Sequence, residues 1–247
     1  MIARSPDITC VIPAFEQPGL LARALTSVVS QGGVDLEIIV ADDSRDGAVR
    51  ERVRGFAVPS VRYLDGARSG NPVDNWNLGL RAARAGACLL VHQDEFLIDP
   101  TYLRRAVDRL ADQRVAAVIG PARVAGLNRR SRFAAASRIA RLAGRPAWLL
   151  PSLNWIGPTA AFVFRRGPAF DPSLVQLVDV AFYRQVLSAG RAAYLEGPCV
   201  GSLGHHDAQI TASIDPRRLA LGEVGRLAAG AELAFHRAVL GLRAGMG

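Results

Sequence analysis

Acidic side chains follow an apolar run in the first half of the chain. Residues 87–91 are apolar or small, and they lead directly into His92, Gln93, Asp94 and Glu95. A short apolar run bounded by polar residues predicts a buried strand, and ligands of an open α/β sheet bind beyond the carboxyl ends of its strands. An imidazole with carboxylate oxygens at that place suits a divalent cation that holds a phosphate. A helix cap is the alternative role of Asp94 and Glu95, and these residues alone leave both roles open.

A second acidic pair, Asp42 and Asp43, follows the apolar residues 36–40. Two adjacent carboxylates at the end of a strand can cap a helix, and they can also accept hydrogen bonds from a nucleobase imide or a ribose hydroxyl. If both apolar runs are parallel strands of one sheet, both acidic groups lie at the same rim. We therefore interpret the two groups together as a candidate site for a nucleotide and a cation.

The elements that must position these groups alternate between strands and helices. Apolar runs predict the strands, and apolar residues at helical spacing between them predict the helices. Strands are expected at 8–12, 36–40, 61–64, 87–91, 115–119, 159–164 and 192–195, and helices at 21–29, 47–55, 73–85, 100–112, 180–189 and 216–242. This alternation is typical of an α/β fold with a mostly parallel sheet. Within the helix at 73–85, Asn77 faces either the rim or solvent.

The composition narrows the class of protein. The 247 residues are 50% hydrophobic and 6% aromatic, which allows one large domain with a sizeable core. The net charge is +8 and every basic side chain is an arginine, so the chemistry of a Schiff-base or phosphate-loop lysine is excluded. The three cysteines lack metal-ligand spacing and indicate a reduced, intracellular protein. The sequence carries no signal-peptide pattern and no apolar run of the roughly 20 residues that span a bilayer.

Arginine is concentrated between residues 127 and 150. In this segment Arg129, Arg130, Arg132, Arg138, Arg141 and Arg145 are interleaved with Phe133, Ile139, Leu142 and Trp148. Such a basic amphipathic helix can lie on an anionic membrane surface or simply expose a solvated arginine face, and we favour the solvated face. We expect the turn at 154–158 to expose Trp155.

Six short motifs, taken in order, resemble the nucleotide-sugar glycosyltransferases of family two, which have the GT-A fold. They are residues 11–16 (VIPAFE), 37–44 (EIIVADDS), 75–80 (NWNLGL) and 92–94 (HQD), then Asp179 ahead of a helix ending at Gly190, and His206 three residues before Gln209. The resemblance implies a Rossmann-like, mostly parallel central sheet flanked by helices. To this the sequence adds a basic helical insertion and a C-terminal helix. We expect one domain with a nucleotide-sugar half at 1–121, an acceptor half at 122–215 and a helix at 216–247.

The resemblance implies a role for each matching residue. Asp94 would bind Mn²⁺ or Mg²⁺ with His92 and His206, and Asp179 would be the general base that deprotonates the acceptor hydroxyl. The nucleotide would lie against Pro13, Ala14, Phe15, Glu16, Asp42, Asp43, Asn77 and Gln93, and the acceptor against Trp155 and Gly157. Two positions depart from the family pattern. His92 replaces an aspartate, and Gly204 replaces an arginine, which leaves His205 open as the late histidine.

The function expected from this resemblance is metal-dependent, inverting transfer of a sugar from a nucleotide diphosphate to an acceptor hydroxyl. The acceptor can be a glycan, a lipid-linked compound or a small metabolite. We expect a bacterial protein of the cytoplasm, with the inner membrane face as an optional contact. A catalytically idle nucleotide-binding relative and a basic adaptor at a membrane surface are the alternatives. A dinucleotide oxidoreductase is disfavoured because no G-x-G-x-x-G turn follows the first strand, and the sequence has no nucleic-acid-binding motif.

Overall fold

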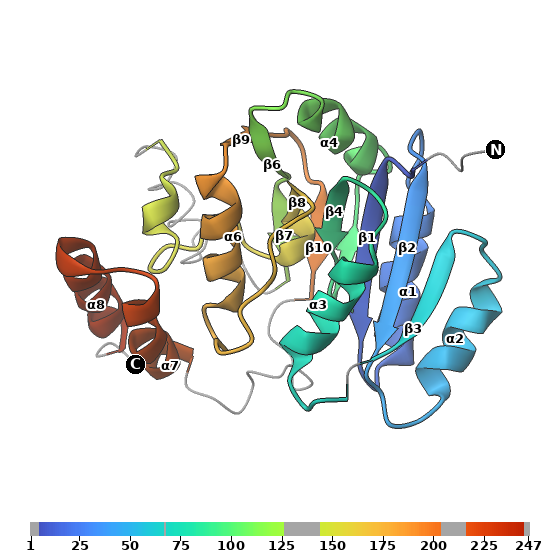
Figure 1. Cartoon of the computed structure of the whole chain (residues 1–247), viewed down its shortest axis with the longest axis horizontal. Coiled ribbons are helices and arrows are strands. Elements are labelled where there is room, and N and C mark those ends of the chain that lie inside the picture. The colour runs from blue at the N-terminus through green and yellow to red at the C-terminus, as the bar shows by residue number, and fades with distance from the viewer. Residues whose placement is uncertain (1–4, 67, 126–143, 204–215, 245–247) are drawn as a thin grey trace.

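The computed structural model of the chain describes residues 5–66, 68–125, 144–203 and 216–244. Its centre is a seven-stranded sheet with the order β3-β2-β1-β4-β8-β6-β9 (Figure 1). The strands are β1 (Ile8–Ala14), β2 (Leu36–Asp42), β3 (Val61–Asp65), β4 (Ala87–Leu90), β6 (Val115–Ile119), β8 (Phe162–Arg165) and β9 (Arg191–Tyr194). Within this sheet β8 runs antiparallel to β4 and β6, and the other strands run parallel to one another. The predicted mostly parallel sheet is confirmed.

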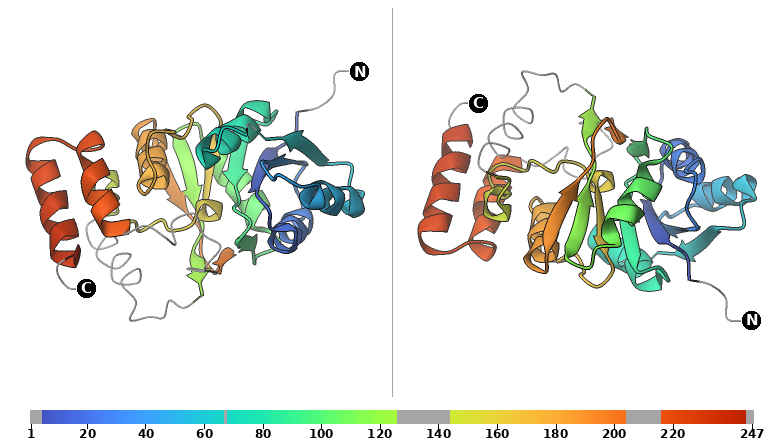
Figure 2. Two further views of the ribbon diagram at one scale, coloured as in Figure 1. Left: turned by 90° about the horizontal axis from the view of Figure 1, so that it is seen from below. Right: turned by 90° about the horizontal axis from the view of Figure 1, so that it is seen from above.

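Helices cover both faces of this sheet (Figure 2). On one face lie α1 (Pro18–Val29), α2 (Ala48–Phe56) and α4 (Tyr102–Leu110), and on the other lie α3 (Pro72–Ala82) and α6 (Val178–Ser188). The last two helices, α7 (Pro216–Glu223) and α8 (Gly230–Ala244), lie beyond α6 at the end of the molecule away from α2 (Figure 1). The flanked α/β architecture follows the prediction.

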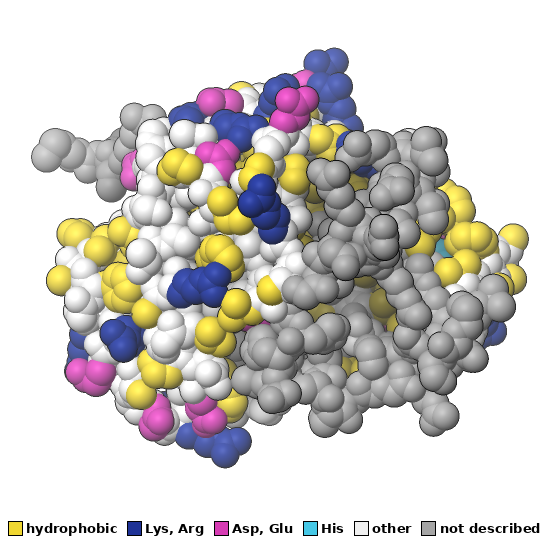
Figure 3. All heavy atoms as spheres, turned by 180° about the vertical axis from the view of Figure 1, so that it is seen from behind, with side chains coloured by type: hydrophobic (Ala, Val, Ile, Leu, Met, Phe, Trp, Pro, Cys, Tyr) yellow, Lys and Arg dark blue, Asp and Glu magenta, His cyan; other side chains and the backbone are white. Residues whose placement is uncertain are grey.

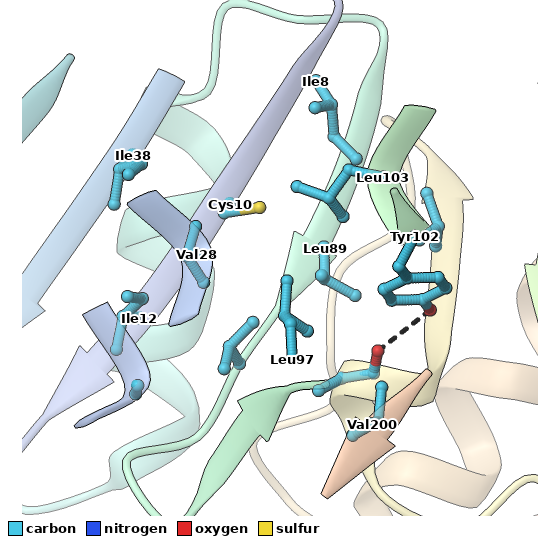
Figure 4. Close-up of a cluster of buried hydrophobic side chains, with 14 of the residues drawn as sticks. Ile8, Cys10, Ile12, Val28, Ile38, Leu89, Leu97, Tyr102, Leu103 and Val200 are labelled. Carbon is cyan, nitrogen blue, oxygen red and sulfur yellow. Dashed lines mark hydrogen bonds between the residues drawn. The ribbon is translucent and has the colours of Figure 1, made fainter. Parts of the chain in front are cut away.

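Side chains of the central strands alternate between two cores, because successive residues of a strand point to opposite faces. Cys10 and Ile12 of β1 lie in the core under α1, α2 and α4, whereas Val11 lies in the core under α3 and α6. Figure 4 shows the first core, where the hydroxyl of Tyr102 donates a hydrogen bond of 3.0 Å to the carbonyl oxygen of Ala160. Each fully buried aliphatic side chain in these two cores contributes about 1.5–3 kcal/mol to the free energy of unfolding.

A second, three-stranded sheet was not predicted from the sequence. It consists of β5 (Glu95–Leu97), β10 (Val200–Ser202) and β7 (Ala122–Val124), with β10 in the middle. Each strand has three residues, which is too short for a periodic apolar pattern to be recognised. Because β5 begins at Glu95, this sheet fixes the chain that follows the end of β4.

Two predicted boundaries are wrong near the site. The helix predicted at 73–85 ends at Ala82, because the N–H of Arg84 donates to Glu37 Oε2 (2.8 Å) and the chain turns toward the sheet instead of continuing the helix. The strand predicted at 159–164 begins with a turn of 3₁₀ helix, η2 (Thr159–Ala161), and only then becomes β8.

The prediction of a single C-terminal helix at 216–242 is also wrong. The segment is divided into α7 and α8, with a turn of 3₁₀ helix, η3 (Val224–Arg226), between them. The carboxylate of Glu223 is buried and accepts backbone N–H groups of the loop before α6, which fixes the end of α7. Gly230 has a φ of 55°, a left-handed conformation that glycine adopts without steric cost and that interrupts a helix.

Most of the arginine-rich segment, residues 126–143, lies outside the described residues. The remainder forms a turn and a short 3₁₀ helix, η1 (Ala147–Leu149), in which Trp148 is exposed and packs edge-on against Phe235 of α8. Within the described part of the molecule, no helix is both long and apolar enough to cross a membrane. Figure 3 shows basic and acidic side chains beside one another on the described part of one face.

Candidate active site

The strands of the sheet bring the predicted site residues to one rim. β1 and β2 pair in parallel up to Ala14 and Asp42, and β1 also pairs in parallel with β4. The segments that follow these three strands therefore leave the sheet at the same edge. They contain Phe15 and Glu16, Asp43, and residues 92–94 respectively.

Gln93 holds the loop that follows β1. Its Oε1 accepts the N–H of Phe15 at 2.8 Å, and its Nε2 donates to the carbonyl of Gln17 at 3.0 Å. The N–H of Glu16 donates to the hydroxyl of Ser44 at 2.8 Å. Glu16 has a φ of 48°, a conformation that costs energy for a residue other than glycine and that persists where the surroundings enforce it. Both polar ends of Gln93 are thus occupied by the loop, while the ring of Phe15 is 44% exposed beside it.

The two members of the acidic pair after β2 have different surroundings. Asp42 is buried, and its carboxylate accepts the N–H of Ser44 at 2.9 Å and the hydroxyl of Tyr63 at 2.6 Å. Asp43 is half-buried, and its Oδ1 accepts the N–H of Arg68 at 2.5 Å. These two bonds make Asp42 part of the support of the rim, whereas Asp43 is the more accessible member of the pair. The nucleotide contact of the pair stays a prediction.

Asn77 is buried and fixes a loop instead of facing the rim or solvent. Its Nδ2 donates to the carbonyl of Phe170 and its Oδ1 accepts the N–H of Phe170, both at 2.9 Å. α3 can approach the sheet closely here because a Cβ on Gly79 would come within 2.4 Å of Val11. One N–H and the oxygen of this amide are therefore bonded to the backbone of Phe170, and the nucleotide contact predicted for Asn77 stays a prediction.

Glu95 links the end of β4 to the start of β8. Its Oε2 accepts the backbone N–H groups of His92 and Ala160 and the hydroxyl of Thr159, each at 3.0 Å. Its Oε1 accepts the N–H of Thr159 at 3.0 Å. Burial, with a smaller contribution from the charge of Asp94, raises the pKa of this carboxyl to about 7. The sequence left Glu95 open as a cation ligand or a helix cap. It did not indicate the bonds to Thr159 and Ala160, because these residues lie more than sixty positions away.

The ring of His92 lies between α3 and η2. It packs against the indole of Trp76, with 4.7 Å between the ring centroids, and its Nδ1 lies 3.2 Å from the hydroxyl oxygen of Thr159. Its Nε2 is buried and has no hydrogen-bond partner among the residues that the structure describes. Buried polar atoms are rarely left unpaired, so this nitrogen is suited to a ligand.

Asp179 lies in the first turn of α6 and belongs to the same group of charges. Its Oδ1 is buried without a hydrogen-bond partner in the described ranges of the chain. Burial raises the pKa of this carboxyl to about 6, with His92 acting to lower it and Glu95 and Asp94 acting to raise it. Asp179 therefore lies within electrostatic reach of His92, Asp94 and Glu95, which are far from it in the sequence.

The predicted acceptor turn is joined to the helix that carries Asp179. Gly157 has a φ of 90°, and its carbonyl accepts the hydroxyl of Tyr183, one turn after Asp179, at 3.1 Å. Trp155 is buried against Tyr194 and not exposed as expected, because the turn folds inward onto the core under α6. Its indole N–H has no hydrogen-bond partner within the described residues.

The donor set for a cation is incomplete in the described part of the chain. There, no group of three or more His, Cys, Asp or Glu side chains is arranged to hold a metal ion. The predicted late ligand, His206, and its alternative, His205, lie outside the described residues. The carboxylate of Asp94 and the buried Nε2 of His92, which has no partner among the described residues, fit a cation, because Mg²⁺ is often held by one or two protein ligands plus substrate phosphates.

Comparison with known proteins identifies the family. The model of glycosyl transferase family 2 matches residues 9–168. An uncharacterized protein of Mycobacterium tuberculosis (MT1568) is 29% identical over 199 residues, 74% of this chain and 62% of that protein. The succinoglycan biosynthesis protein ExoO of Rhizobium meliloti is 32% identical over 108 residues, 44% of this chain and 31% of that protein. This chain thus spans less than two thirds of the length of either relative.

Solved structures share the fold. A mannosyltransferase from Pyrobaculum calidifontis, PcManGT, in complex with GDP-Man and Mn²⁺, has a TM-score of 0.67 at 18% identity, covering 99% of this chain and 77% of that one. Residues 1–349 of TarS from S. aureus, in complex with UDP-GlcNAc, also have a TM-score of 0.67, at 16% identity, covering 94% of this chain and 70% of that one. The sheet order and these matches define the GT-A fold. The chain belongs to glycosyl transferase family 2.

Proposed function

We propose that the chain transfers a sugar from a nucleotide-diphosphate donor to an acceptor hydroxyl, with inversion at the anomeric carbon. The observation that carries this proposal is a pair of buried polar atoms, Asp179 Oδ1 and His92 Nε2, that have no hydrogen-bond partner among the described residues and that lie near the charge of Asp94. The two structural neighbours described above were solved with nucleotide sugars, GDP-Man and UDP-GlcNAc, which supports a donor of this chemical class.

The nucleoside of the donor lies, in this proposal, between the loop after β1 and the end of β2. Gln93 and Ser44 hold that loop in a fixed conformation, so little entropy is lost when a ligand binds. The exposed ring of Phe15 can pack against a base, and Asp43 can accept hydrogen bonds from the base or ribose. Pro13 and Ala14 are buried in β1 and support the loop from below.

Asp179 is the general base of the proposed reaction. The acceptor oxygen forms a bond to the anomeric carbon while the bond from that carbon to the diphosphate oxygen breaks on the opposite face. The proton of the acceptor hydroxyl moves to Asp179 Oδ1, which has no other hydrogen-bond partner in the described chain. General-base assistance of this kind accelerates a reaction by about 10²–10⁴-fold.

Asp94 and His92 would hold Mn²⁺ or Mg²⁺ in this proposal. When bound, the cation stabilises the negative charge that develops on the leaving diphosphate.

The turn at Gly157 is the proposed acceptor contact, since Tyr183 ties it to the helix of Asp179. A glycan, a lipid-linked compound or a small metabolite is compatible with this turn, and Trp155 acts as its buried support.

A thermal-unfolding panel of GDP- and UDP-sugars, with and without Mn²⁺, tests the donor and the cation. At about 100 times its dissociation constant, the correct donor stabilises the fold by about 2.7 kcal/mol. We expect this stabilisation to require Mn²⁺ in the native chain, to be lost in Asp94→Asn, and to persist in the control Asp108→Asn, whose carboxylate pairs with Arg104 on α4. No stabilisation by any nucleotide sugar, or full stabilisation of Asp94→Asn, contradicts the proposal.

A further inference from the structure

Thr159 lies between the carboxylate of Glu95 and the ring of His92. Its hydroxyl oxygen is 3.0 Å from Glu95 Oε2 and 3.2 Å from His92 Nδ1. Thr159 and Glu95 are 3% and 4% exposed, so water does not compete for these bonds. A hydroxyl has one proton, so it donates to one of these neighbours and accepts from the other.

The direction of the hydroxyl proton follows from the surroundings of Glu95. Three backbone N–H groups, those of His92, Thr159 and Ala160, already donate to its two oxygens. An ionised carboxylate only accepts hydrogen bonds, and the hydroxyl of Thr159 lies 3.0 Å from its Oε2. A hydrogen bond to a charged acceptor is roughly twice as strong as one between neutral groups, so the hydroxyl donates to Glu95 and not to the ring nitrogen.

We infer that Glu95, acting through Thr159, holds His92 in the tautomer that carries its proton on Nδ1. Because the hydroxyl oxygen of Thr159 has given its proton to Glu95, it can only accept from the ring, and Nδ1 is the atom that donates to it. The lone pair of Nε2 then remains available. This is the buried nitrogen without a partner in the described chain, in a ring whose face is fixed by Trp76. Glu95 and Thr159 are positioning residues for His92.

The consequence is a ring nitrogen preset to give an electron pair to a ligand. A histidine that binds a cation needs a free lone pair on one nitrogen, and the hydrogen bond at the other nitrogen decides which one it is. With the opposite tautomer, the site would present an N–H that repels a cation. The role of this lone pair as a cation ligand rests on the proposed function, whereas the tautomer itself is a property of the chain alone.

Nitrogen-15 NMR of the ring tests the inference without any sugar, nucleotide or metal. The full chain is labelled at its histidines and recorded at pH about 8, where an ordinary imidazole is neutral. A protonated and an unprotonated ring nitrogen have well-separated resonances, and loss of one set in His92→Gln assigns the signals. We expect Nδ1 to be protonated and Nε2 unprotonated in the native chain, opposite to the preference of free histidine.

Two variants of Thr159 show whether its hydroxyl is the cause. Thr159→Ser keeps the hydroxyl and should keep the native tautomer. Thr159→Val has the same shape without the hydroxyl, and the ratio of the two tautomers should shift by roughly tenfold toward Nε2–H, the effect expected for one hydrogen bond. Native-like circular dichroism confirms that each variant is folded. A proton on Nε2 in the native chain, or an unchanged tautomer in folded Thr159→Val, overturns the inference.

Discussion

Asn77→Leu separates a structural role of this side chain from a role in nucleotide binding. The substitution keeps the size of the side chain but removes both hydrogen bonds to Phe170. The backbone N–H and carbonyl of Phe170 then stay buried without partners, since Phe170 is 2% exposed. Each unsatisfied group costs about 1–3 kcal/mol, so the free energy of unfolding should fall by about 2–6 kcal/mol. For a chain of this length, each 1 kcal/mol lowers Tm by about 2–4 °C.

Urea unfolding of the native chain and the variant measures this loss. The matched control is Asn71→Ala at the start of the same helix, whose half-buried side chain caps α3 and donates to the carbonyl of Pro172. Loss of such a cap costs about 1 kcal/mol, clearly less than the loss expected for Asn77→Leu. At a temperature where both variants are folded, nucleotide binding should be retained. A stable Asn77→Leu variant that no longer binds nucleotide would show that Asn77 contacts the ligand.

Further predictions concern the stability of the fold around the site. Burial alone would raise the pKa of Glu37, but its hydrogen bonds outweigh burial and hold that pKa below its usual value. The contribution of Glu37 to the free energy of unfolding should therefore be complete above about pH 4.3 and decrease as the pH falls through the lower folded pKa. Urea unfolding of Glu37→Gln at a series of pH values should lack this decrease. The same dependence of the free energy of unfolding on pH in the variant and the native chain would refute the prediction. Glu223→Ala leaves three backbone N–H groups without their acceptor and should cost about 3 kcal/mol or more in urea unfolding. Gly79→Ala should cost about 1–3 kcal/mol because its Cβ meets Val11, whereas Gly55→Ala, which meets no atom within 4 Å, should be neutral or stabilising; equal Tm values would contradict the close packing.

The sheet and the convergence of the rim were predictable because they depend on local patterns. Apolar runs such as 36–40 and 87–91 identify buried strands, and parallel strands bring their carboxyl ends to one edge. The first turn of α6, with Asp179, was likewise placed within two residues. Spacing and motif order were enough here because each element positions its own residue.

The roles of individual polar residues were less predictable, because they depend on contacts distant in the sequence. Asn77 accepts the backbone N–H of Phe170, and Gln93 accepts the backbone N–H of Phe15. A sequence pattern gives the type of each residue but not its hydrogen-bond partner. The helix break near Gly230 did have a local signal, in the glycines of that segment, which the apolar spacing outweighed in our prediction.

The anomeric configuration of the sugar released when the donor reacts with water tests the central claim most directly. Water can replace the acceptor, so proton NMR of the freshly released sugar needs no knowledge of the acceptor. With the donor identified by thermal unfolding, we expect the native chain and Asp108→Asn to release first the anomer opposite to that of the donor. Asp179→Asn should bind the donor but release sugar about 10²–10⁴-fold more slowly. Release of the retained anomer, or undiminished release by Asp179→Asn, would contradict the account.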